Sequence, residues 1–523
     1  MRWVPHRDAE GGNLTLSVRD ARLARQDEAL DPGLPALLRA RYLLPLADAV
    51  GRSVRIADGY ALWRAGKIVE VGAFEPAVAE RLIASFGAQL QVLTDEGVRR
   101  GVAQLSDFFQ HPGVLMPGFV KAHGHDHEPP IIGICKDMPL TRWLDGVINP
   151  FTGFLHDHRD ALIARLGRSP QLVSYLKARV DDLCYGITTS MVHHCNFAKY
   201  HGDDLALAAE TAGTQMIIAV GGQDRHYVER LLDTPQQATA RLDGYLARHG
   251  DSELVRFIPG PDQFFSNGPE MLKALKAWAR SHGTLLHCHS SEEKGTTAWF
   301  RRTYGQTPVE YAHSIGVLDR DTVVAHQVHC TERDLEILAE TGVSVVHNPL
   351  ANTILGSGMP PIPEMLRRGI PLAISTDGSG SADNQNILAA ARLASQYQKA
   401  LHSDAELLPA QQVLEMITID AAKMLRVDAG SLAVGTRADL IVIDVTRPNL
   451  VPTRFGSVVE NLIWASDGSE VELVVGGGRI LRHGGVFHTL DVKQVLQDIE
   501  TLSESFERHL AEAGAMRGTG ANR

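Results

Sequence analysis

A long repeat of strand-like and helix-like segments occupies the middle of this 523-residue chain. From Val114 to about Leu425, short apolar segments alternate with segments of helical periodicity such as 271–278. The apolar segments end near His125, His193, Gly221, Gly260, His289, His326, His347 and Asp377. Eight strands that alternate with helices over roughly 300 residues predict an α/β fold, a (β/α)8 TIM-type barrel, whose reactive side chains lie at the carboxyl ends of the strands.

The first of these strand ends carries two histidines, His123 and His125, separated by Gly124. They follow the apolar run 114–120, which the pattern predicts to be one buried strand. Side chains alternate between the two faces of a strand, so both imidazoles are expected to point the same way and to bind one metal ion, zinc or iron. The alternative is a pair of ordinary histidines satisfied by hydrogen bonds, but burying two imidazoles without a ligand is costly.

Composition excludes several classes of protein. The net charge of −11, from 62 acidic and 51 basic residues, argues against a nucleic-acid-binding protein and against a basic patch that binds membranes. The five cysteines are scattered and form no Cys-x-x-Cys motif, as is usual in the reducing cytoplasm. Residues 1–19 lack the apolar core of a signal peptide, and no apolar run approaches the roughly 20 residues of a membrane span. We therefore expect a soluble cytoplasmic protein.

The two ends of the chain differ in pattern from the middle. Strand-like pieces precede the repeat at 41–45, 59–63 and 66–72, and others follow it at 435–444 and 471–480. A helix is expected at 77–86 and another at 492–510. These patterns predict an N-terminal extension (1–37), the first part of a small β-sandwich (38–113), the barrel (114–428), the second part of the sandwich (429–490), and a C-terminal helix and tail (491–523).

Five short motifs in a fixed order resemble the amidohydrolase superfamily. They are Pro-Gly-Phe-Val-x-x-His-x-His (117–125), His-x-x-Glu (289–292), Ala-His (325–326), His-Asn-Pro (347–349) and Ser-Thr-Asp-Gly (375–378), followed by the strand-like segment 438–444. The resemblance covers about 40–487 and is strongest to the branch of cytosine, guanine and adenosine-derivative deaminases and triazine hydrolases. It implies that the metal ligands are His123, His125, His289 and Asp377.

This ligand set fits a catalytic site, because three imidazoles and one carboxylate leave a position open for water or substrate. His287 is the alternative to His289, since strand alternation turns both side chains the same way. His289 is favoured because it stands three residues before Glu292. One divalent ion per chain is expected, zinc first and iron second. In other branches of the superfamily a carboxylated lysine bridges two metals, and the predicted fourth strand, 253–260, contains no lysine.

Three side chains are expected to carry the chemistry. Glu292 would bring a proton to a ring nitrogen of the substrate and later to the departing amine, and Glu293 is its less favoured neighbour. His326 would steer the attacking hydroxide or polarise the tetrahedral centre, the alternative being a core histidine under the barrel mouth. Asp377 would accept a proton while it remains a ligand.

Polar residues near the strand ends are the candidates for substrate contacts. They are His127, His193, His194, Gln223, His347 and Asn348. Each has the alternative of an ordinary loop residue, since loops carry polar side chains for solvation alone. Asn386 resembles a family position that braces the metal-binding loop from outside the ligand set. The acidic residues Asp126 and Glu128, on either side of His127, favour a cationic or donor-rich ligand.

These features predict an aminohydrolase, a metal-dependent deaminase that releases ammonia from an amino-substituted nitrogen heterocycle. The alternative is a hydrolase of the same fold that cleaves a carbon–halogen, urea or carbamate bond; the presence of both Glu292 and Asp377 favours an amine leaving group. A non-catalytic barrel that serves as a scaffold is less favoured, because buried ionisable groups without a function cost stability. The expected partner is a small-molecule substrate, with a homodimer as the default assembly.

Overall fold

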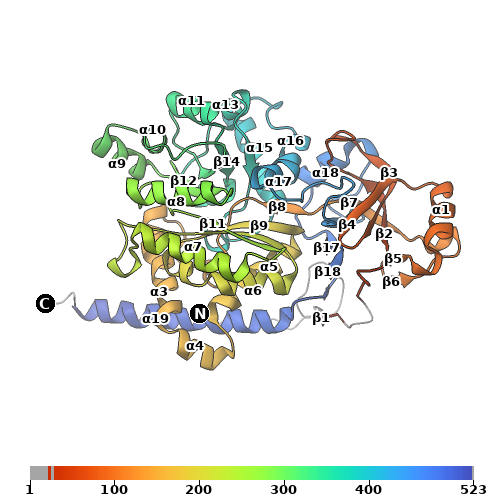
Figure 1. Cartoon of the computed structure of the whole chain (residues 1–523), viewed down its shortest axis with the longest axis horizontal. Coiled ribbons are helices and arrows are strands. Elements are labelled where there is room, and N and C mark those ends of the chain that lie inside the picture. Colours follow the sequence, from red (N-terminus) through yellow and green to blue (C-terminus); the bar gives the residue numbers. More distant parts are fainter. Residues whose placement is uncertain (1–21, 25–28, 521–523) are drawn as a thin grey trace.

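A computed structural model of the protein describes residues 22–24 and 29–520. Most of the predicted extension, 1–21 and 25–28, and the final residues 521–523 of the predicted tail lie outside the described residues. Strands alternating with helices form the left-hand part of the molecule in Figure 1, and strands from both ends of the chain form the right-hand part. Among the described residues, no helix has both the length and the hydrophobicity to cross a membrane.

Eight parallel strands form two four-stranded sheets in the left-hand part. One sheet contains β8 (Phe119–Lys121), β9 (Ile187–His194), β10 (Gln215–Val220) and β11 (Val255–Pro259); the other contains β12 (Leu286–Ser290), β13 (Thr322–His326), β14 (Ser344–His347) and β15 (Leu372–Ile374). One buried apolar cluster draws on seven of these strands and on Leu285, which directly precedes β12. The predicted alternation of strands and helices is therefore confirmed, whereas closure of the two sheets into one barrel stays a prediction.

Helices follow most of these strands and pack against them. After β9 to β15 they are α6 (Gly202–Ala212), α7 (Pro235–His249), α8 (Pro269–Ser281), α9 (Lys294–Tyr304), α10 (Pro308–Ser314), α11 (Glu332–Thr341), α12 (Pro349–Ile354), α13 (Ile362–Arg367), α14 (Ser379–Ala382), α15 (Ile387–His402), α16 (Ala410–Met416) and α17 (Ile419–Leu425). Two of them, α7 and α10, begin at a threonine, Thr234 and Thr307, whose side chain accepts a backbone N–H, with a proline in the first turn. The predicted helix 271–278 lies within α8.

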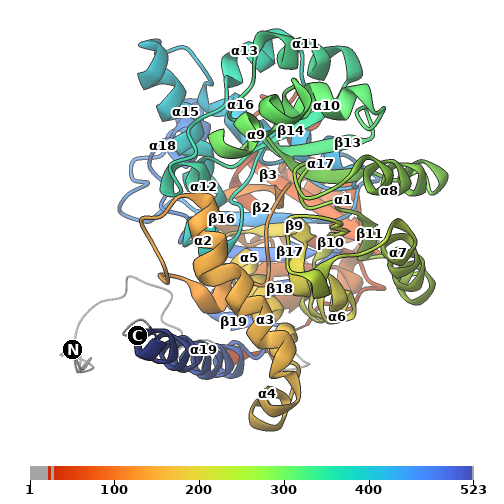
Figure 2. The ribbon, with the colours of Figure 1, turned by 90° about the vertical axis from the view of Figure 1, so that its left-hand side faces the viewer.

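A longer insertion separates β8 from β9. It contains α2 (Leu140–Trp143), the π-helix η6 (Leu144–Ile148), α3 (Asn149–Asp157), α4 (Arg159–Leu166) and α5 (Pro170–Cys184). The C-terminal helix α19 (Val492–Gly520) runs along this insertion in Figure 1 and lies beside α3 and α4 in Figure 2. The ring centroid of Phe506 lies 4.9 Å from that of Phe151. Phe506 and Phe151 belong to one buried apolar cluster that also includes Leu140 and Trp143. Helix α19 therefore packs against the insertion.

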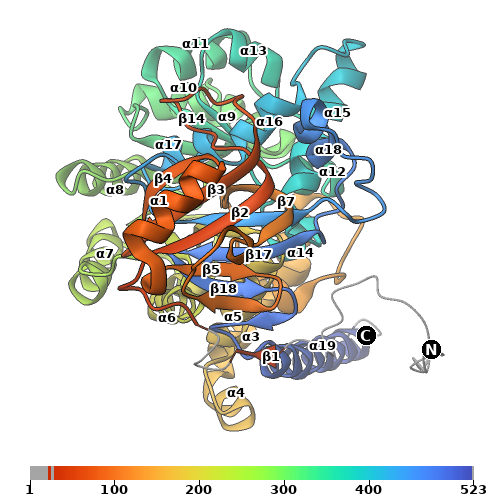
Figure 3. The same cartoon turned by 90° about the vertical axis from the view of Figure 1, so that its right-hand side faces the viewer.

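Strands from both ends of the chain pair in a single eleven-stranded sheet (Figure 3). The N-terminal ones are β1 (Arg22–Leu23), β2 (Ala36–Leu43), β3 (Ile56–Arg64), β4 (Lys67–Ala73), β5 (Gln91–Thr94), β6 (Gly97–Arg100) and β7 (Gln110–Pro117), and the C-terminal ones are β16 (Leu440–Asp444), β17 (Val471–Gly476), β18 (Arg479–His483) and β19 (Val486–Phe487). The helices of this part are α1 (Pro76–Phe86), at the predicted position, and α18 (Val458–Trp464). The antiparallel pairing of β7 with β16 joins the two ends. A sandwich of two separate sheets stays a prediction.

The predicted single strand 114–120 is wrong, because the segment divides at Gly118 between two sheets. β7 ends at Pro117, which has no N–H to donate, and β8 begins at Phe119. Gly118 N donates to Asp439 O at 3.1 Å, whereas Phe119 N donates to Gly186 O at 2.9 Å. The chain therefore leaves the eleven-stranded sheet and enters the parallel sheet within one residue.

Gly118→Ala is expected to destabilise this junction. A Cβ atom at residue 118 would lie 2.3 Å from Thr188 Oγ1, well inside van der Waals contact. Overpacking of this kind costs about 1–3 kcal/mol, so the urea midpoint of unfolding should fall. Gly456→Ala is the control, because a Cβ at Gly456 meets nothing within 4 Å. Equal midpoints for the two variants would contradict the steric account.

Candidate active site

The two histidines of the first strand end lie beyond the strand itself. β8 ends at Lys121, so strand alternation does not set the directions of His123 and His125. Their rings are nevertheless close, with centroids 4.9 Å apart and planes at 87°. His125 Nδ1 lies 2.8 Å from the carbonyl oxygen of His193, which can only accept, so Nδ1 carries the proton and the Nε2 lone pair is free.

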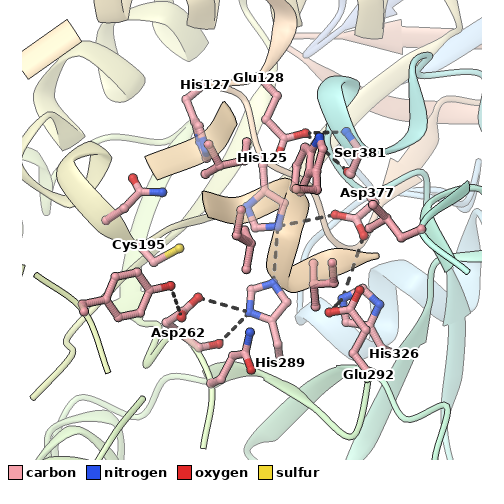
Figure 4. A pocket seen from close by; sticks show the side chains of 18 residues that line it. His125, His127, Glu128, Cys195, Asp262, His289, Glu292, His326, Asp377 and Ser381 are labelled. Carbon is pink, nitrogen blue, oxygen red and sulfur yellow. Dashed lines mark hydrogen bonds and ion pairs between the residues drawn. The ribbon is translucent and has the colours of Figure 1, made fainter. Parts of the chain in front are cut away.

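Asp377 and His289 complete a tight group around that lone pair (Figure 4). Asp377 Oδ1 lies 3.3 Å from His123 Nε2 and 3.4 Å from His125 Nε2. His289 Nε2 lies 3.3 Å from His125 Nε2, and its Nδ1 donates to Asp262 O at 2.6 Å. The structure thus brings together all four predicted ligands, from three widely separated strand ends.

The donor set fits a divalent metal ion. Neither ring nitrogen of His123 has a hydrogen-bond partner among the described residues, although the side chain is fully buried. Burial and the neighbouring His125 lower the pKa values of His123 and His289, so both imidazoles are neutral and can act as ligands. The sets His123–His125–Asp377 and His123–His289–His326 each have ligand atoms within 4.8 Å of one another. An ion at this point would satisfy nitrogens that are otherwise unpaired.

His287, the alternative to His289, has a different environment. Its Nδ1 lies 2.8 Å from Nδ1 of His193, and its ring stacks on His123 with centroids 4.9 Å apart. It belongs to none of the candidate ligand groups among the described residues. The geometry therefore favours His289 over His287.

Glu292 and His326 lie beside the cluster. His326 Nε2 is 3.4 Å from Glu292 Oε2 and 3.9 Å from Asp377 Oδ2. The side-chain amide of Asn352 donates to His326 Nδ1 at 3.0 Å, so a neutral His326 carries its proton on Nε2, facing the two carboxyl groups. The side-chain nitrogen Nδ2 of Asn348 lies 3.5 Å from the same Nδ1 atom.

Burial shifts the protonation of both groups. Burial raises the pKa of Glu292 well above its usual range, and the carboxylates of Asp377, Glu293 and Asp262 raise it further. Burial likewise holds the pKa of His326 well below its usual range. The raised pKa favours the protonated carboxyl form of Glu292, and the lowered pKa favours the neutral imidazole of His326. Glu293 faces elsewhere, since its Oε2 accepts a hydrogen bond from Thr141 Oγ1 at 2.7 Å.

Polar and apolar side chains both line the cavity over these groups. The polar ones include His125, Asp262, His289, Glu292, His326 and Asp377 (Figure 4). The apolar wall consists of Leu140, Trp143, Leu144 and Ile148, from α2 and η6, together with Leu355. The sequence reasoning missed this apolar wall, although the spacing of those four residues on one helical face was a signal for it.

Only some of the predicted substrate residues reach the cavity. His127 lines it, and Asn348 contacts His326 instead. His193, His194, Gln223 and His347 are buried and do not line this cavity. Gln223 is held away from it by Lys199, whose Nζ donates to Gln223 Oε1 at 3.0 Å.

Glu128 also lines the cavity. From the sequence it was named only as one of two acidic residues beside His127, and not as a substrate contact. Its Oε2 accepts hydrogen bonds from the backbone N–H groups of Gly380 and Ser381 at 2.8 and 3.0 Å. Burial and the neighbouring Asp377 raise the pKa of this carboxyl to about 8. Glu128 therefore ties the loop after His125 to the start of α14.

The adjacent amides Gln385 and Asn386 make different contacts. Asn386 caps α15, its Oδ1 accepting from Ala389 N at 3.0 Å, and its amide donates to the Asp467 carbonyl. Gln385 Nε2 instead donates to the carbonyl of Asp377 at 3.1 Å. Asn386 therefore contacts the first turn of α15 and Asp467, and its bracing of the metal-binding loop stays a prediction.

Known proteins resemble this chain over most of its length. Residues 114–481 match the amidohydrolase family. The 5'-deoxyadenosine deaminase of Methanothermobacter thermautotrophicus is 31% identical over 408 residues, which cover 78% of this chain and 88% of that protein. The 5-methylthioadenosine/S-adenosylhomocysteine deaminase of Moorella thermoacetica is 32% identical over 395 residues, 74% of this chain and 86% of that protein.

Solved structures share the fold. An adenosine deaminase from Xanthomonas campestris with bound zinc superposes with a TM-score of 0.77 at 23% identity, covering 90% of this chain and 98% of that one. Atrazine chlorohydrolase from Arthrobacter aurescens, complexed with zinc, gives a TM-score of 0.76 at 21% identity, covering 90% of this chain and all of that one. At such identities the likeness shows the fold alone.

Proposed function

Since the chain belongs to the amidohydrolase family, we propose that it is a zinc-dependent aminohydrolase that replaces an amino group on a nitrogen heterocycle with oxygen from water, releasing ammonia. One observation carries the proposal: the buried carboxyl group of Glu292 lies 3.4 Å from His326 Nε2, beside a group of His and Asp side chains suited to hold a metal. The deaminase relatives support the same reaction and point to adenosine derivatives as the first substrates to test.

His123, His125, His289 and Asp377 would hold one zinc ion per chain, with iron as the alternative. Such an ion would lower the pKa of water towards neutrality and so supply a nucleophile near neutral pH. The other steps belong to the chain's own side chains.

Glu292 is placed to act as the acid. As a carboxylic acid it would protonate a ring nitrogen, which makes the adjacent carbon electrophilic. The resulting carboxylate would then take the proton of the newly added hydroxyl group and pass it to the departing amine as the carbon–nitrogen bond breaks, and the water proton held by Asp377 would restore the acid. His326 Nε2–H, oriented by Asn352, can donate to the oxygen that develops negative charge. Asp377 Oδ2, 3.9 Å from His326 Nε2, can accept the proton from the attacking water.

The shape of the cavity limits the substrate. The heterocycle would sit with its amino-bearing edge toward Glu292 and Asp377 and an apolar face or substituent against the wall of Leu140, Trp143 and Ile148. His127 and Glu128 would contact polar groups at its rim. An aromatic ring packed on Trp143 gains both apolar burial and stacking.

The test is ammonia release by zinc-loaded protein from a panel of adenosine derivatives, aminopurines, aminopyrimidines, pterins and triazines. The proposal predicts release from at least one class. If protein shown to contain zinc released no ammonia from any compound of the panel, the result would contradict the proposal and favour hydrolysis of a carbon–halogen, urea or carbamate bond.

The molecular organisation remains part of the proposal. We propose a closed eight-stranded barrel over 114–428, flanked by a small β domain built from 38–113 and 429–490. The shared apolar cluster of the two parallel sheets supports closure. A cytoplasmic location and a homodimer are proposed on the sequence arguments alone.

A further inference from the structure

Four charged side chains lie completely buried beneath the candidate active site. We term Lys121, Asp126, Arg179 and Asp182 the buried ion network; each side chain is at most 1% exposed. Lys121 Nζ lies 2.9 Å from Asp182 Oδ1 and 3.4 Å from Asp126 Oδ1. Arg179 pairs with Asp182 at 2.8 Å and also with Asp126. Two positive and two negative charges therefore balance.

Stability alone does not explain such a network. Removing charges from water costs several kcal/mol per ion, and replacing a buried ion cluster with apolar residues is often neutral or stabilising. A buried network is better explained by what it positions, and here its members come from different elements. Lys121 ends β8, Asp126 directly follows His125, and Arg179 and Asp182 lie on α5.

Lys121 also reaches the loop on the far side of the metal cluster. Its Nζ donates to Gln385 Oε1 at 3.1 Å, and the same oxygen accepts from Thr376 Oγ1 at 2.9 Å. Gln385 Nε2 donates to the carbonyl of Asp377 at 3.1 Å. One ammonium group thus connects the segment that carries His125, through Asp126, with the segment that carries Asp377.

Asp377 requires such support because its backbone is in the left-handed region, with φ at 70°. A non-glycine residue in this region is strained and persists only where its surroundings hold it. The hydrogen bond from Gln385 holds the Asp377 carbonyl on one side. On the other side, Ser375 Oγ donates to His123 O at 2.6 Å and accepts from His123 N at 3.1 Å.

We propose that Lys121 and Gln385 are positioning residues that fix the distance between the His123–His125 segment and Asp377, and thereby set metal affinity. Neither touches the reacting atoms. This inference rests on the proposed metal site, and it predicts that the network acts on the ion and only through it on turnover. Partners of this kind outside the ligand set typically change metal affinity 10- to 100-fold.

The test compares Lys121→Met with Lys276→Met in the full-length protein. Lys276 offers a matched control: it is another buried lysine, paired with Asp319 and hydrogen-bonded to Thr322 Oγ1 at 2.8 Å, at the opposite end of β13 from the active site. Zinc affinity is measured by competition with a chelator, and the absorption spectrum of the cobalt-substituted protein reports ligand geometry. Lys121→Met should weaken zinc binding by about 10- to 100-fold and alter the cobalt spectrum, whereas Lys276→Met should change neither.

Gln385→Leu provides a second variant that leaves Lys121 paired with Asp126 and Asp182. Gln385→Leu should also weaken zinc binding about tenfold or more. The double variant should lose less zinc affinity than the sum of the two single losses, because both substitutions remove the same contact between Lys121 and Gln385. Wild-type zinc affinity in folded Gln385→Leu, or equal losses in Lys121→Met and Lys276→Met, would overturn the inference while leaving the proposed function intact. A wild-type protein that binds no zinc would overturn the metal site itself.

Discussion

Glu292→Gln is expected to abolish most ammonia release while zinc content stays at the wild-type value. The glutamine keeps the size and burial of the side chain but has no proton to give to a ring nitrogen or to the departing amine. General acid catalysis contributes on the order of 10²- to 10⁴-fold, so kcat should fall by that factor. Stopped assays of ammonia and metal analysis of the same preparation measure both quantities.

Glu293→Gln is the matched control for that experiment. It makes the same chemical change one residue further along, where the carboxylate accepts a hydrogen bond from Thr141 and does not line the cavity. Its activity should remain within a few-fold of wild type. If Glu292→Gln kept near-full activity, or if both variants lost activity equally, Glu292 would not be the proton carrier.

His289→Ala is expected to lose bound zinc. The variant removes a proposed ligand whose Nε2 lies 3.3 Å from His125 Nε2, and the loss should exceed the roughly 100-fold change typical of partners outside the ligand set. Dialysed protein should therefore fall from about one zinc per chain to almost none. His313→Ala, at an exposed position on α10, should retain the wild-type content. Full zinc content in His289→Ala would contradict the assignment and point to His287.

The parts of the site that depend on strand ends could be predicted from sequence. Apolar segments that finish with His or Asp place those side chains at one edge of a parallel sheet, and His194, His326 and His347 do end strands β9, β13 and β14. His289 and Asp377 were therefore identifiable as neighbours although 88 positions separate them (377 − 289). They lie close together because the strands near whose ends they lie are parallel members of one sheet, and the local sequence around each residue contributes less.

Local turns and side-chain directions were less predictable. The run 114–120 contains Pro117 and Gly118, a pair that often marks a break, but its apolar character is continuous because both halves are buried strands. Gln385 and Asn386 are adjacent amides, and only the start of α15 decides which one faces Asp377. Gln223 was predicted to line the cavity, but Lys199 draws it away through a contact that sequence spacing does not show.

The residues that line the cavity were also difficult to predict from the sequence. Trp143 and its apolar neighbours lie in an insertion between β8 and β9, where a helical face can cover the site or simply pack against the rest of the protein. Here it does both, because the cluster that contains Trp143 also contains Phe506 of α19. Which residues face the substrate depended on packing between segments more than 300 residues apart (506 − 143).

Oxygen-isotope labelling shows whether this protein uses water to replace an amino group. The zinc-loaded protein is incubated in ¹⁸O-water with the substrate that releases most ammonia, and the product is analysed by mass spectrometry. The account predicts one ¹⁸O atom per product molecule, equal amounts of ammonia and product, and no conversion after zinc is removed. Product without ¹⁸O, or turnover that persists in metal-free protein, would contradict it.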